Sequence, residues 1–178
     1  IGDGVFKNCN KLTHMTLPNS ITSIGVDAFA GCTGLKHLNV GCDIKLVDSN
    51  ILGQIKGVTL LEGVKNAEHL KQFRNIKSYN GMYSSSDGRC LVVDGRLIRF
   101  VGDGVTHYAI PYGVTKIDDE ALCDRSALTS IALPESLKSI GSKAFYGCSG
   151  LTDIVIPNGV TWIGANALNC FNLVSLTC

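Results

Sequence analysis

Histidine is the residue type in this chain whose spacing most suggests chemistry. His14 and His37 lie one period apart in the sequence repeat described below, and His107 falls at the same phase of that repeat. Two imidazoles brought side by side can bind a metal ion, or form a surface whose charge changes near pH ~6.5. The outward neighbours of the pair, Thr16 and Asn39, do not supply a third metal ligand. A solvated pair is therefore the favoured interpretation, and the sequence predicts no metal site and no cofactor.

The eight cysteines are a second candidate for chemistry. Cys9 and Cys32 are also one repeat period apart, so stacked repeats would bring them within the Cα distance that a disulfide tolerates. Side chains in such a ladder point in parallel, which suits the torsion of about 90° in a disulfide poorly. No Cys-x-x-Cys pair occurs, which disfavours a zinc ribbon or a thioredoxin-like centre. Cys9, Cys32, Cys148 and Cys170 are predicted to be reduced packing residues.

Motifs of catalytic and phosphate-binding sites are missing from the sequence. It contains no Gly-x-Ser-x-Gly, His-Glu-x-x-His, Gly-x-Gly-x-x-Gly, Walker or EF-hand pattern. The densest acidic cluster is 118–120, where a solvated surface is favoured over a calcium site. A net charge of +1 gives no field to attract nucleic acid or an anionic membrane, and no apolar run is long enough to cross a bilayer. The sequence therefore predicts a protein that is not an enzyme and does not bind nucleic acid.

The elements that position these residues recur with a period of about 23 residues, which lies in the range typical of solenoid repeats. Segment 28–35 (AFAGCTGL) returns as 144–151 (AFYGCSGL), and in weaker form as 5–12. All four prolines occupy one phase of the repeat, between two short stretches in which apolar and polar residues alternate. This alternation predicts two short strands per unit, each with one buried face. The prolines are Pro18, Pro111, Pro134 and Pro157.

A unit of two short strands cannot bury its apolar side alone, so neighbouring units must stack into a solenoid. Gly25, Gly141 and Gly164 follow the second strand of their units. We expect these glycines to permit a tight turn at that point.

The unit resembles the leucine-rich repeat of the BspA (Treponema pallidum) type, roughly L-x-x-I-x-I-P-x-x-V-x-x-I-G-x-x-A-F-x-x-C-x-x. Residues 151–164 fit every defined position, and 12–25 fit with Met15 as the one exchange. The resemblance implies a β-rich, right-handed leucine-rich-repeat solenoid, with a parallel sheet on its concave face and short strands and turns on its convex face. It also implies a cell-surface or secreted protein, of the kind that adheres to host or neighbouring cells.

The repeat is interrupted in the middle of the chain. Residues 1–56 and 105–178 carry repeats, and 57–104 are predicted to be a degenerate repeat with an insertion, within one continuous solenoid domain. Segment 66–74 could form a short helix with Asn66 as its N-cap. Asp94-Gly95 lies between two apolar runs, which is typical of a β-hairpin, and the surrounding residues resemble an insertion common in this family. We expect the hairpin to project, either as a partner site or as a tolerated insertion. The chain also stops within a repeat, so we expect it to be a piece of a longer protein.

A broad rigid sheet without a deep pocket favours recognition over catalysis. The predicted partner is a protein, such as a host extracellular-matrix or other cell-surface protein, or a glycan, bound through the concave sheet. The alternatives are a spacer that presents another domain and, less favoured, an accessory domain of an enzyme. Tyr112 and Trp162 lie off that face and would be anchors only if exposed. The outward residues predicted to bind the partner are His14, Thr16, His37, Asn39, His107, Ala109, Ser130, Ala132, Asp153 and Val155.

Overall fold

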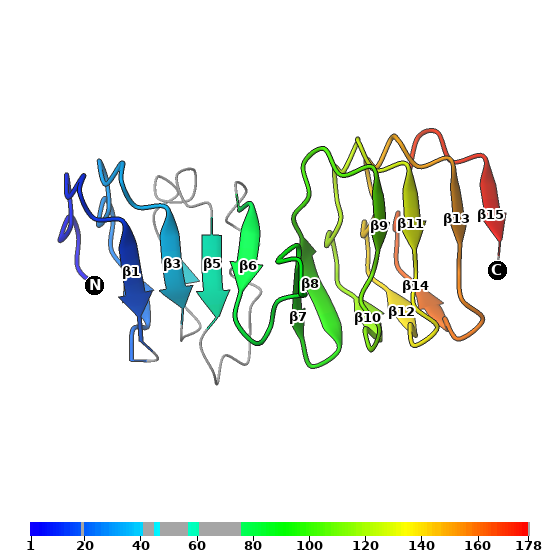
Figure 1. Cartoon of the computed structure of the whole chain (residues 1–178), viewed down its shortest axis with the longest axis horizontal. Helices are drawn as coiled ribbons and strands as arrows, with labels where there is room; N and C mark the ends of the chain where they lie inside the picture. The colour runs from blue at the N-terminus through cyan, green and yellow to red at the C-terminus, as the bar shows by residue number, and fades with distance from the viewer. Residues whose placement is uncertain (19, 41–44, 47–56, 61–75, 178) are drawn as a thin grey trace. The chain divides into compact units, whose positions relative to one another are not determined.

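The computed structural model of the protein describes residues 1–18, 20–40, 45–46, 57–60 and 76–177. Within these residues the chain forms β-strands and turns and no helix (Figure 1). They fall into two compact units, Ile1–Gly88 and Arg89–Cys178. The predicted β-solenoid is confirmed. The helix predicted at 66–74 lies outside the described residues, and the domain boundaries at 56/57 and 104/105 stay a prediction.

The strand that precedes the proline position builds one parallel sheet in the first unit. Its order is β1-β3-β5-β6 (Figure 1). His14 of β1 pairs in register with His37 of β3. The strand that follows the proline forms a shorter pair, β2 with β4, also parallel. The strands of this unit are β1 (His14–Leu17), β2 (Ser23–Ile24), β3 (His37–Val40), β4 (Lys45–Leu46), β5 (Gly57–Leu60) and β6 (Ser78–Asn80).

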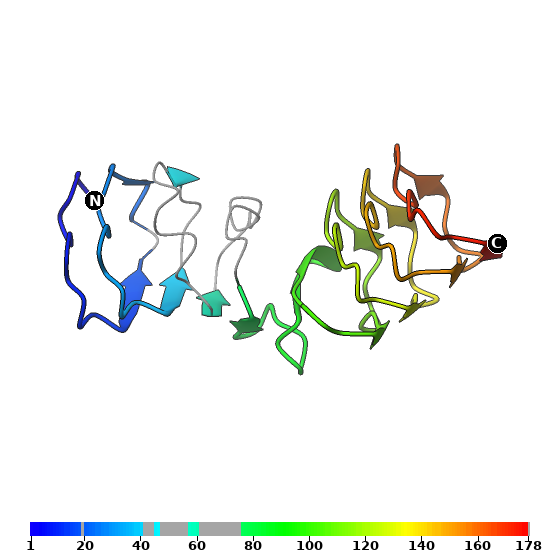
Figure 2. The same ribbon diagram turned by 90° about the horizontal axis from the view of Figure 1, so that it is seen from above.

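The second unit repeats this plan, and its coils follow one another when seen from above (Figure 2). Here β9 pairs with β11 and β13 with β15, while the strands after the prolines belong to a five-stranded sheet of order β14-β12-β10-β8-β7. Its strands are β7 (Cys90–Val93), β8 (Arg96–Phe100), β9 (His107–Ala109), β10 (Lys116–Ile117), β11 (Ser130–Ala132), β12 (Ser139–Ile140), β13 (Asp153–Val155), β14 (Trp162–Ile163) and β15 (Ser175–Thr177).

The core of the second unit consists of residues that recur at the repeat period. Ile131 and Ile154, at the centres of β11 and β13, are buried, while the residues on either side of each are exposed. Leu128 and Leu151 are also buried one period apart. Each apolar side chain therefore covers its counterpart in the next coil, as the alternation predicts.

The turns of successive coils are joined by their own hydrogen-bond ladder. Alternate backbone N–H groups donate to a carbonyl in the turn of the following coil, as from Glu120 to Ser142 and from Asp124 to Tyr146, at 3.0 and 2.8 Å. Glu120 and Asp124 have left-handed backbones, with φ of 59° and 60°. A left-handed backbone is uncommon in residues other than glycine. In these turns it directs the backbone N–H groups toward carbonyl groups of the following coil.

The glycines after the second strands have a different role from the expected one. Their φ values are not left-handed, so the tight-turn explanation is wrong. A Cβ on Gly25 would lie 2.6 Å from the backbone nitrogen of Asp3, and one on Gly164 would lie 2.5 Å from that of Ser142. These positions are glycine because the backbone of the preceding coil passes too close for any side chain.

The Asp94-Gly95 hairpin is confirmed, but it does not project. Both residues have left-handed backbones, with φ of 51° and 73°, as a two-residue hairpin turn requires. Strand β7 pairs antiparallel with β8, and β8 pairs parallel with β10, so the hairpin continues the sheet. Leu97 and Phe100 are buried in the same core as the coils. We expected the hairpin to project because the sequence does not show that β8 belongs to the sheet formed by the second strands of the repeats.

A partly buried ion pair joins this hairpin to the first full coil of the second unit. Arg96 donates from Nη2 to Oδ2 of Asp118 at 2.6 Å and from Nε to Oδ1 at 3.2 Å. Lys116 lies 3.6 Å from the same carboxylate. Asp118 is only 2% exposed, so the prediction that 118–120 form a solvated cluster is wrong for this residue. Asp118 occupies the repeat position at which the next two coils have Gly141 and Gly164. The strand that precedes it, β10, pairs with β8.

Candidate binding surface

We call the outward side of the strands that precede the proline position the first-strand face. In the first unit it carries the histidine pair, whose ring centroids are 5.7 Å apart with planes at 41°. Thr16 pairs with Asn39 in the same two strands, and Asn39 Nδ2 donates to Thr16 Oγ1 at 3.2 Å. The parallel register therefore sets two polar rows side by side, as the sequence predicts.

The local environment affects His37 in particular. Partial burial is the main factor that lowers the pKa of the His37 imidazole, and the neighbouring His14 lowers it further. A hydrogen bond with the Asn39 side chain opposes this change, because it stabilises the protonated ring. His37 therefore favours its neutral form at physiological pH.

The first-strand face of the second unit is made of smaller side chains. His107 pairs in register with Ser130, and Ala109 pairs with Ala132. Val155 is exposed in β13. Short side chains on an in-register sheet leave a surface that an extended partner can approach closely.

The predicted binding residues divide between the two units. Those in β1 and β3 belong to the first unit, and those in β9, β11 and β13 to the second. All of them are exposed or half-exposed, so the outward orientation expected from the alternation is found. Their role in binding stays a prediction. The residues are His14, Thr16, His37, Asn39, His107, Ala109, Ser130, Ala132, Asp153 and Val155.

Two aromatic residues lie outside the first-strand face. Tyr112 follows Pro111 in a turn and is 91% exposed, and Trp162 in β14 is 51% exposed. Exposed aromatic rings are common anchors in protein interfaces. Both rings are therefore accessible at positions outside the sheet face.

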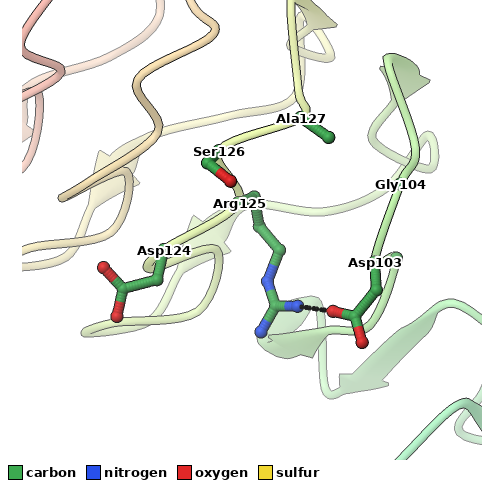
Figure 3. A pocket seen from close by; sticks show the side chains of 7 residues that line it. Asp103, Gly104, Asp124, Arg125, Ser126 and Ala127 are labelled. Atoms are coloured by element: carbon green, nitrogen blue, oxygen red, sulfur yellow. Dashed lines mark hydrogen bonds and ion pairs between the residues drawn. The ribbon is translucent and has the colours of Figure 1, made fainter.

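A hollow of about 240 Å³ lies beside the turns of the second unit. In it Arg125 points toward Asp103 and donates from Nη1 to Oδ1 at 2.6 Å (Figure 3). Arg125 stands where the other coils have the repeat cysteine, and this exchange was the only sequence signal of the hollow. Because Asp103 already neutralises the guanidinium, we assign no ligand to the hollow. Its lining consists of Gly102, Asp103, Gly104, Asp124, Arg125, Ser126 and Ala127.

The repeat cysteines bind the backbone of the preceding coil. Cys32 donates its S–H to the carbonyl of Phe6 at 2.9 Å, and Cys148 donates to that of Leu122 at 3.1 Å. Cys170 donates to Phe145 at 3.2 Å, although its coil is one residue shorter. The six described cysteines have free thiols, and Cys32, Cys148 and Cys170 are buried, as the packing role requires. The same prediction is wrong for Cys9, which is exposed, because no described coil lies before it to cover the thiol. Cys42 and Cys178 lie outside the described residues.

Cys148 should resist alkylation in the folded protein. Burial raises the pKa of its thiol to about 12, so the reactive thiolate is scarce at pH ~8. Cys9 is exposed and serves as the internal control. We expect mass spectrometry after a short iodoacetamide treatment to find Cys9 modified and Cys148 unmodified, and both modified in urea. Equal modification rates without denaturant would contradict this role of burial.

Comparison with known sequences identifies the repeat. The model of the BspA type leucine-rich repeat region matches residues 1–81 and 99–178, in six copies. The chain belongs to this family. Leucine-rich repeats of this family are generally non-catalytic. The two matched segments leave out most of the β7–β8 hairpin. A comparison with curated proteins finds no match.

Solved structures of leucine-rich-repeat proteins share this fold. The pneumococcal vaccine antigen PcpA is 21% identical with a TM-score of 0.51, over 93% of this chain and 50% of the antigen. A leucine-rich-repeat protein from Eubacterium ventriosum is 22% identical with a TM-score of 0.52, over 99% of this chain and 56% of that one. The leucine-rich-repeat chain thus spans about half the length of these two proteins. Its described part has no helix that is long and apolar enough to span a bilayer.

Proposed function

We propose that this leucine-rich-repeat chain is a non-enzymatic binding module of a bacterial cell-surface or secreted protein, and that it recognises a protein or glycan through the first-strand face. The observation that carries the proposal is the set of in-register rows of small and polar side chains exposed on parallel strands. The location follows from the resemblance of the repeat to surface and secreted proteins of this family.

The physical properties of the face support recognition of a broad partner surface. Within each unit, successive coils are tied together by backbone hydrogen bonds in both the strands and the turns, so the part of the face that each unit carries is ordered before a partner arrives. A preordered surface loses little conformational entropy on binding. Contacts of about 800 Å² per partner are usual for stable protein interfaces, and a sheet of several strands can supply such an area.

Arginine substitutions on the face test the proposal. We expect Ala132→Arg or Ala109→Arg to weaken saturable binding to purified host matrix proteins, or to a glycan array, by at least about tenfold, because each inserts a long charged side chain into the contact. Both alanines are exposed, so the fold should persist by circular dichroism. Asn158→Arg, at an exposed turn position after Pro157, is the matched control and should bind normally.

The rival function is a spacer that presents another domain. It predicts that the arginine variants at positions 109 and 132 bind or adhere as the unchanged protein does. That result, obtained with folded protein, would replace the binding proposal with the spacer.

A further inference from the structure

The imidazole rings of His14 and His37 each have a polar side chain at hydrogen-bonding distance, which the sequence alone does not show. His14 Nδ1 lies 3.1 Å from Thr13 Oγ1, and the side chain of Asn39 forms a hydrogen bond with His37. Asn39 is itself held by its bond to Thr16. Each ring thus has an oxygen-bearing neighbour that can accept from one ring nitrogen. In a neutral imidazole whose one nitrogen donates, the other nitrogen carries a lone pair.

This arrangement is the one that metal-binding histidines usually have. A ligating imidazole binds the ion through one nitrogen and donates from the other to an oxygen atom, which fixes the tautomer and the ring orientation. In His14 the threonine hydroxyl is placed to accept this bond, and in His37 the asparagine side chain is placed to do so.

The spacing of the two rings also suits a shared ion. With Zn–N bonds of about 2.1 Å and a tetrahedral angle at the metal, the two ring centroids would lie about 5.2 Å apart. The observed separation is 5.7 Å, close to this value. The next residue in the same row of the sheet is Gly57, which pairs in register with His37 and brings no side chain to this side.

We propose that His14 and His37 form a two-histidine surface site for a divalent transition-metal ion of the zinc type. The described residues contain no group of three or more potential metal ligands, so within them the site has two protein ligands, and water fills the remaining coordination positions. Such an open site can exchange its outer ligands, as zinc sites with open positions do. The proposal does not depend on the partner-binding proposal above.

Zinc titration with histidine substitutions tests the site. The full chain is first treated with iodoacetamide under native conditions to block accessible thiols such as Cys9, and Zn²⁺ is then added while the imidazole ¹⁵N resonances are followed by NMR. We expect His14 and His37 to shift together with one binding curve. His14→Gln and His37→Gln should each weaken binding at least about tenfold, because the second imidazole acts at a high effective concentration.

Two control variants make the result specific to the pair. His107→Gln removes a histidine that has the same threonine contact, at 2.8 Å, but whose register partner is Ser130. His69→Gln/His107→Gln leaves only the pair. Both variants should bind Zn²⁺ as tightly as the unchanged protein. The proposal is overturned if the unchanged protein binds no zinc, if the His14 and His37 variants bind equally well, or if either control loses the site.

Discussion

Replacing Arg96 by methionine should lower the free energy of unfolding by about 2 kcal/mol, because it leaves the buried Asp118 carboxylate without its main partner. Lys116, at 3.6 Å, compensates only in part. Since Arg96 is 43% exposed, the cost is smaller than for a fully buried pair. Urea denaturation followed by circular dichroism measures the change.

Replacing the other partner of the ion pair should lower the free energy of unfolding by less. In Asp118→Asn the uncharged amide keeps the shape of the side chain, and the Arg96 guanidinium is left half in solvent, where water stabilises it. We expect less than half of the loss seen for Arg96→Met. The double variant should be more stable than Arg96→Met alone, because no unpaired buried charge remains. Equal losses for the two single variants would contradict this account of the ion pair.

Replacing Gly141 by alanine should destabilise the second unit by about 3 kcal/mol, at the upper end of ordinary overpacking effects. The new Cβ would lie 2.5 Å from the carbonyl carbon of Asp118 and would also meet the backbone nitrogen of Asp119. Both are main-chain atoms of the preceding coil, so they cannot move aside as a side-chain end would. Thermal or urea denaturation checks the result.

Gly2 provides the matched control for this substitution. It occupies the same phase of the repeat, but a Cβ there would meet only Val5 Cγ2, at an ordinary 3.7 Å. Gly2→Ala should therefore leave the stability almost unchanged. If the two alanine variants were equally destabilised, backbone conformation rather than the approach of the preceding coil would explain the glycines.

The regular part of the fold could be predicted because the same residues recur at one phase. The four prolines mark the strand pairs, and in-register stacking then places His37 over His14 and Ala132 over Ala109. The packing role of Cys32, Cys148 and Cys170 followed from the same ladder.

The irregular features could not be predicted in this way. Asp118 stands at a glycine position and looked like part of a solvated acidic cluster, because the sequence does not show that β8 brings Arg96 beside it. The hairpin was expected to project for the same reason. The glycine positions were recognised, but their cause was missed, since the approach of a neighbouring coil is not visible in any single repeat.

The turn ladder gives each stack of coils a direction. In both units the alternate turn N–H groups point toward the following coil and the matching carbonyls toward the preceding one, as in Phe6 to Ala28 and Phe145 to Ala167. One end of such a stack therefore presents acceptors in its turns and the other presents donors. Two like ends brought together would oppose donor to donor, or acceptor to acceptor. In the turns, only head-to-tail contact of two stacks would therefore join donors to acceptors, and head-to-tail contact generates open chains of copies rather than closed two-fold pairs.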